Sequence, residues 1–155
     1  MGNPAVRTGL LYGLIAGVFG AINTVLSITG VTKSLGFTAL LGFVFFIIGI
    51  LIYLLAGRAA AAQTGKVSSG AIAGLVTGVV GGLIGLLLTL VQYFVAPGSI
   101  NSALGSASTA GLSSAVLLTA VIIGAIIGLA IALGIGALLG ALGGLMGRGA
   151  YRPGV

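Results

Sequence analysis

Long apolar runs alternate with short polar segments along the whole chain. The uncharged runs cover about residues 9–28, 35–56, 67–95 and 112–146. A run of about 18 or more apolar residues predicts a transmembrane helix, because about 20 helical residues span the hydrocarbon layer of a bilayer. The pattern therefore predicts an all-α integral membrane protein, with four transmembrane helices in a single domain over residues 1–155.

The polar segments between these runs predict three loops. Residues 29–36 form a tight polar turn, residues 57–69 carry two cations, and residues 96–111 are uncharged and rich in Ser, Ala and Gly. Pro97-Gly98 ends the third run. The third and fourth runs are longer than a bilayer requires, so we expect these helices to tilt, bend or project into the interface.

Glycines recur within the runs at intervals of three and four residues. GLLYGLIAGVFG (9–20) and GAIAGLVTGVVG (70–81) share the spacing G-x-x-x-G-x-x-x-G-x-x-G. This spacing gathers small residues on one helix face, and in lipid such faces let helix backbones approach closely and gain van der Waals contact. The sequence thus predicts glycine-zipper packing at Gly9, Gly13, Gly17, Gly20, Gly70, Gly74, Gly78, Gly81, Gly124, Gly128, Gly136 and Gly140.

The shared spacing also indicates an internal repeat. The first and third runs cross the membrane in the same direction, which predicts a parallel duplication of a two-helix hairpin, with repeats at 8–66 and 69–152. The second and fourth runs share only LAGRAA (55–60) and LMGRGA (145–150). Because the second run is bulky with phenylalanine, we expect the other three spans to pack tightly and this one to face more lipid.

The charged residues predict an orientation. The chain is 59% hydrophobic and 4% charged, with six cations and no Asp or Glu. Five cations fall on the side of the termini and only Lys33 on the other, so the positive-inside rule predicts a multi-pass protein of the cell (inner or plasma) membrane with both termini cytoplasmic. The five are topology anchors, or contacts for anionic lipid or an acidic partner: Arg7, Arg58, Lys66, Arg148 and Arg152.

A few polar side chains lie inside the predicted spans. Asn23, Thr24 and Ser27 continue the glycine face of the first span, and Gln92 lies on that of the third, near the same membrane surface. If the two faces meet, these four residues form a small polar pocket or solute path. Interhelical hydrogen bonds and placement in the wet interface are the structural alternatives.

The composition excludes most catalytic chemistry. General acid–base catalysis normally uses His or a carboxylate, metal sites use Cys, His, Asp or Glu, and the chain has none of these residues. The remaining catalytic arrangement is a Ser-Lys pair, either Lys66 near Ser68 and Ser69 or Lys33 beside Ser34, but a hydrated lysine at a helix end suits an anchor better than a base. We therefore predict no enzyme activity, no metal and no cofactor, and no basic aromatic surface for nucleic acid.

Two functional hypotheses follow. The first is a structural or accessory subunit that binds other membrane subunits, or copies of itself, through its glycine-lined helix faces within the lipid bilayer. The second is an uncoupled channel or facilitator for a small neutral or apolar solute. Organisation of lipid or pigment has the same sequence features as the first hypothesis.

Overall fold

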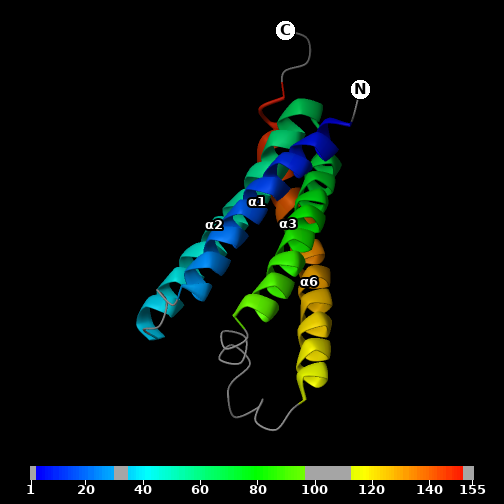
Figure 1. Cartoon of the computed structure of the whole chain (residues 1–155). Helices are drawn as coiled ribbons and strands as arrows, with labels where there is room; N and C mark the ends of the chain where they lie inside the picture. The colour runs from blue at the N-terminus through cyan, green and yellow to red at the C-terminus, as the bar shows by residue number, and fades with distance from the viewer. Residues whose placement is uncertain (1–2, 30–34, 97–112, 152–155) are drawn as a thin grey trace.

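Four long helices form the protein. The computed structural model describes residues 3–29, 35–96 and 113–151, and within them all regular structure is helical. The helices are α1 (Pro4–Ile28), α2 (Leu35–Thr64), α3 (Val67–Val95) and α6 (Ser114–Arg148), as Figure 1 shows. Each is long and apolar enough to cross a membrane, which confirms the prediction of four long apolar helices and fits a multi-pass membrane protein.

The helix boundaries agree with the sequence pattern except at the polar ends. The bounds of α3 are those predicted, whereas α1 begins earlier, at Pro4, where the Asn3 side chain accepts a hydrogen bond from the amide of Ala5 at 3.0 Å. The prediction of a loop from residue 57 is wrong, because α2 continues to Thr64. The alanines at 59–62 favour helix, so α2 continues beyond the end of its apolar run.

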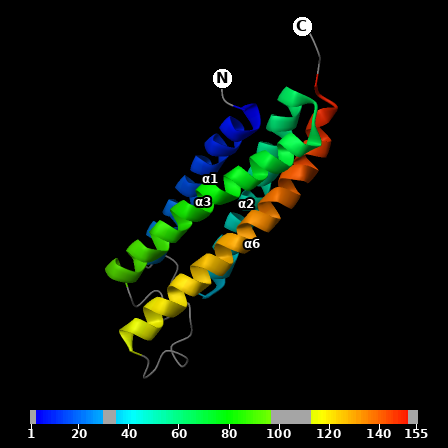
Figure 2. The same ribbon diagram turned by 90° about the vertical axis from the view of Figure 1, so that its right-hand side faces the viewer.

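The α2–α3 connection is very short. Gly65 has a φ of 70°, the left-handed conformation that commonly ends a helix, and its amide donates to the carbonyl of Ala61 at 2.7 Å. The start of α1, this connection and the end of α6 lie at one end of the bundle, here called the terminal end (Figures 1 and 2). The opposite end is called the far end, and α2 diverges from α3 and α6 toward it (Figure 1).

The central helix is α3, which packs against α6 on one side and α1 on the other, while α1 and α6 barely touch. The expectation that the second span faces more lipid than the others is wrong for its terminal half, where Ile52, Ala56 and Ala60 are buried and α2 packs against α6. The small side chains of Ala56 and Ala60 let the backbones of the neighbouring helices come close to α2. In the other half of α2, Phe43 and Phe46 are exposed, as expected.

A buried hydroxyl connects α3 to α1. Thr77 is 0% exposed, and its Oγ1 donates to the carbonyl oxygens of Ala73 in its own helix at 2.9 Å and Gly9 of α1 at 3.2 Å. A second polar contact joins α2 to α1, because Gln63 Nε2 donates to Thr8 Oγ1 at 3.4 Å. Both contacts lie toward the terminal end, where α1 depends on them as well as on apolar packing.

We predict that Thr77→Val destabilises the protein by about 0.6–1.7 kcal/mol, because it removes the interhelical hydrogen bond at nearly constant volume. The measurement is the free energy of unfolding in mixed micelles, followed by circular dichroism during denaturant titration. Thr89→Val is the matched control, since the Thr89 hydroxyl donates to Gly85 within α3 at 2.9 Å. Equal losses in the two variants would contradict the prediction.

Candidate functional site

Three helices meet backbone to backbone near the terminal end. A Cβ atom placed on Gly140 of α6 would lie 2.5 Å from the carbonyl oxygen of Gly70 and 2.8 Å from the Cα of Gly74, both on α3. A Cβ on Gly57 of α2 would collide with the backbone of Gly140. We call this contact the glycine seam, and it consists of Gly57, Gly70, Gly74, Gly136, Gly140, Gly143, Gly144 and Gly147.

The predicted list contained only half of the seam. Gly57, Gly143, Gly144 and Gly147 were missing, although Gly143 would collide with the backbone of Leu54 and Gly147 with that of Arg58 if either carried a Cβ. The signal for α6 was present in its sequence. Gly140, Gly143, Gly144 and Gly147 each follow another of these glycines by three or four residues, which keeps them, together with Gly136, on one side of the helix.

The glycines of α1 have a different kind of partner. A Cβ on Gly9 would lie 2.6 Å from Val76 Cβ, and one on Gly13 would lie 2.6 Å from Val80 Cβ. The glycines of α1 thus form hollows that receive β-branched side chains of α3, although a Cβ on Gly9 would also lie 2.7 Å from the carbonyl oxygen of Ala73, whereas Gly70 and Gly74 of α3 face the backbone of α6. The equivalent stripes of the predicted repeat are used differently, and the duplication itself stays a prediction.

The other predicted glycines range from tight contacts to open surroundings. Gly78 lies near the carbonyl of Ala132, a Cβ on Gly17 would collide with the Ile84 side chain, and the nearest neighbours of Gly81 and Gly20 are side chains at 3.3 and 3.8 Å. Around Gly124 and Gly128 the described structure places no atom within 4 Å of a Cβ, so their expected contacts with the other spans are not formed. A spacing of four residues falls about 40° behind the helix turn at each step, which carries Gly124 about 120° away from Gly136.

The polar residues of the first span bond mainly within their own helix. Thr24 donates to the carbonyl of Gly20 and Ser27 to that of Asn23, each at 3.0 Å, and Asn23 is exposed. Gln92 is partly exposed near the far end of α3. A cavity of about 150 Å³ lies elsewhere, between α3 and α6, and its lining includes none of these four residues: Leu86, Thr89, Leu90, Val121, Ile122 and Ala125.

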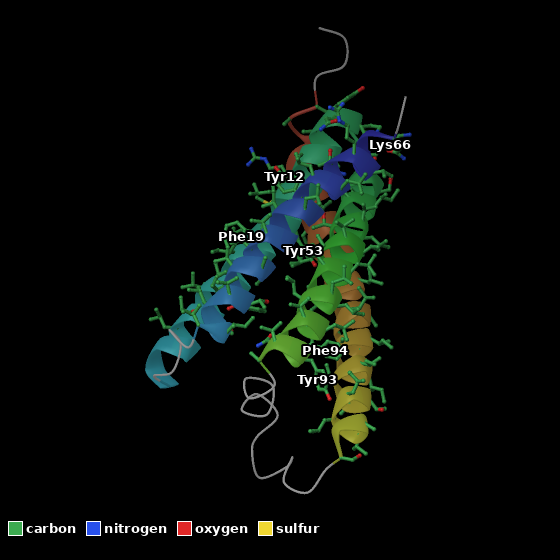
Figure 3. The ribbon with its side chains drawn as sticks, in the orientation of Figure 1. Tyr12, Phe19, Tyr53, Lys66, Tyr93 and Phe94 are labelled. Atoms are coloured by element: carbon green, nitrogen blue, oxygen red, sulfur yellow. The ribbon has the colours of Figure 1, made fainter. Side chains whose placement is uncertain are left out.

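The two ends of the bundle differ in chemistry. Arg7, Arg58, Lys66 and Arg148 are all exposed and belong to the segments that meet at the terminal end, where Figure 3 labels Lys66. Arg152 lies outside the described residues. At the far end of α3, the rings of Tyr93 and Phe94 pack edge to face, with their centroids 5.3 Å apart (Figure 3). Aromatic residues in such a place are typical of the membrane–water interface.

We predict that Gly74→Ala destabilises the protein by about 1–3 kcal/mol, because its Cβ would collide with the backbone of Gly136 and force α3 away from α6. Thermal unfolding in detergent measures the loss. Gly85→Ala is the matched control on the same helix, since a Cβ there meets no described atom within 4 Å, and we expect a change within about 0.5 kcal/mol. If Gly85→Ala unfolded at as low a temperature as Gly74→Ala, the collision in the seam would not be the cause of the lost stability.

Comparison with known proteins gives no relative. No family model, no curated protein and no solved structure matches the chain. Packing surfaces and charge are therefore the features from which a function has to be inferred.

Proposed function

We propose that the protein is a non-catalytic structural subunit of the cell membrane, which assembles with other membrane subunits or with copies of itself through small-residue helix faces. Both termini would lie in the cytoplasm, because five of the six cations of the chain fall on that side of the predicted spans. Lipid is the solvent of the four helices, and the glycine-lined surface is the part of the protein that carries its role.

The open surface of α6 is the observation that carries this proposal. Gly124 and Gly128 are exposed in the half of α6 that extends beyond the seam. A glycine that faces lipid contributes no apolar side chain to it. Small residues four positions apart do, however, let a second helix approach closely, which makes this surface suitable for a helix of another chain.

The fold does not require these two glycines. The seam already joins α2, α3 and α6. The helix α1 is held by the α3 side chains that enter its hollows and by the Thr77 hydrogen bond. An intramolecular role therefore accounts for the seam but leaves Gly124 and Gly128 without one. Contact with a second chain gives them the same role that Gly70 and Gly74 have within this chain.

An uncoupled channel for a small neutral or apolar solute is the alternative function. Its candidate lining was the polar set near the far end, and two of those hydroxyls bond within α1. Flux into liposomes separates the two functions. Permeability that exceeds that of empty vesicles and falls in an Asn23→Leu variant would favour the channel.

We predict that the double variant Gly124→Leu/Gly128→Leu lowers assembly about tenfold or more, because overpacking a close contact costs about 1–3 kcal/mol. The measurement is the assembled fraction by native mass spectrometry after extraction in mild detergent. Gly134→Leu is the matched control, since Gly134 has equally open surroundings but lies about 80–120° around α6 from the other two. A wild-type chain that is monomeric at every detergent concentration would refute the proposal.

A further inference from the structure

A pair of arginines at the terminal end provides a second, independent site. We propose that Arg58 of α2 and Arg148 of α6 together bind the phosphate group of an anionic phospholipid. The site is separate from the proposed assembly surface, because Gly124 and Gly128 lie in the opposite half of α6. Either proposal can therefore fail without the other.

The glycine seam fixes the two arginines side by side. A Cβ on Gly147 would lie 2.9 Å from both the Cα and the carbonyl carbon of Arg58, and a Cβ on Gly143 would lie 3.0 Å from the amide nitrogen of Arg58. Arg148 follows Gly147 directly in α6. Two rigid helices in backbone contact, rather than a loop, thus hold the starting points of both side chains.

The charge of this pair has no counter-ion among the side chains of the protein. Both arginines are exposed, and the chain contains no Asp or Glu. Two guanidinium groups on neighbouring helices repel each other, and an anion between them offsets that repulsion. The planar guanidinium group also matches the geometry of phosphate oxygens and donates two parallel hydrogen bonds to them, which makes phosphate the best-suited anion.

The surroundings of the pair indicate a lipid rather than free phosphate. Arg58 and Arg148 follow the apolar runs of their helices within two residues, at the depth where headgroups lie. Leu55 and Leu145 each precede one of the arginines by three residues, on the same side of the helix, and are 46% and 51% exposed. A phosphate between the arginines would therefore have apolar surface beside it for its acyl chains.

The other cations lack this arrangement. Arg7 is exposed at the same end, but it belongs to α1, which barely touches α6. Lys66 follows Gly65 in the short connection and carries a compact ammonium rather than a planar fork. Arg7 therefore offers a matched control, since it has the same side chain and the same exposure but no neighbouring arginine fixed by a backbone contact.

The test uses the full chain in nanodiscs of phosphatidylcholine, with and without phosphatidylglycerol. Lipid that remains bound after transfer to mild detergent is counted by native mass spectrometry. We expect the wild type to retain phosphatidylglycerol selectively, and Arg58→Gln or Arg148→Gln to lower that retention about fivefold each, the factor that corresponds to one cation near an anionic surface. Arg7→Gln should retain phosphatidylglycerol as the wild type does.

Four results would overturn the proposal. The wild type could retain both lipids equally, or Arg7→Gln could lose as much phosphatidylglycerol as Arg58→Gln, which would mean a diffuse basic collar. Displacement of the lipid by excess inorganic phosphate would assign the pair to a soluble anion. Finally, Arg58→Gln should unfold in detergent at the same temperature as the wild type; earlier unfolding would show that the α2–α6 contact, and not the charge, was disturbed.

Discussion

Backbone contact between glycines in a lipid solvent is the interaction on which the rest of the structure depends. Lipid tails are as apolar as leucine side chains, so the hydrophobic effect does not drive these helices together, and close van der Waals contact must do so. Gly140 shows how concentrated that contact is, because it touches the backbone of α2 at Gly57 and of α3 at Gly70 and Gly74. One methyl group at this point would separate three helices.

The seam also explains the asymmetry of the bundle. Where α2 and α6 carry small residues facing their neighbours, the helices meet; toward the far end α2 carries exposed Phe43 and Phe46, and α6 turns Gly124 away from α3. Packing at one end is sufficient because each helix is long and stiff, so a contact over a few turns fixes the direction of the whole helix. In the far half the contacts of α3 with α1 and α6 are made through side chains, such as Leu129 against Gly82.

The sequence predicted the helices well and their contacts only in part. Apolar run lengths gave four spans and the bounds of α3, because the hydrocarbon layer sets a length that composition records. The spacing places Gly70, Gly74 and Gly136 on helix faces, but it does not show which helix packs against each face. Val76 and Val80 of α3 fill the α1 hollows, because the side of α3 that carries them faces α1 while its seam glycines face α6. Which side of α3 faces which helix can be read only from the three-dimensional arrangement. The drift that turns Gly124 away from Gly136 follows from the four-residue spacing alone.

The terminal end combines the tightest packing with the highest charge, and the magnitudes show which effect dominates. Two unit charges about 10 Å apart in water repel by about 0.4 kcal/mol. Physiological salt lowers this energy further, because its Debye length of about 8 Å is shorter than that separation. The exposed cations there therefore oppose packing by only a few such increments, while a single collision in the seam costs about 1–3 kcal/mol. Contact between the seam glycines keeps the charged residues near one another, and the charges do not help to hold the helices together. For this reason the position of Arg58 beside Arg148 is a consequence of Gly143 and Gly147, and it persists whether or not an anion is bound.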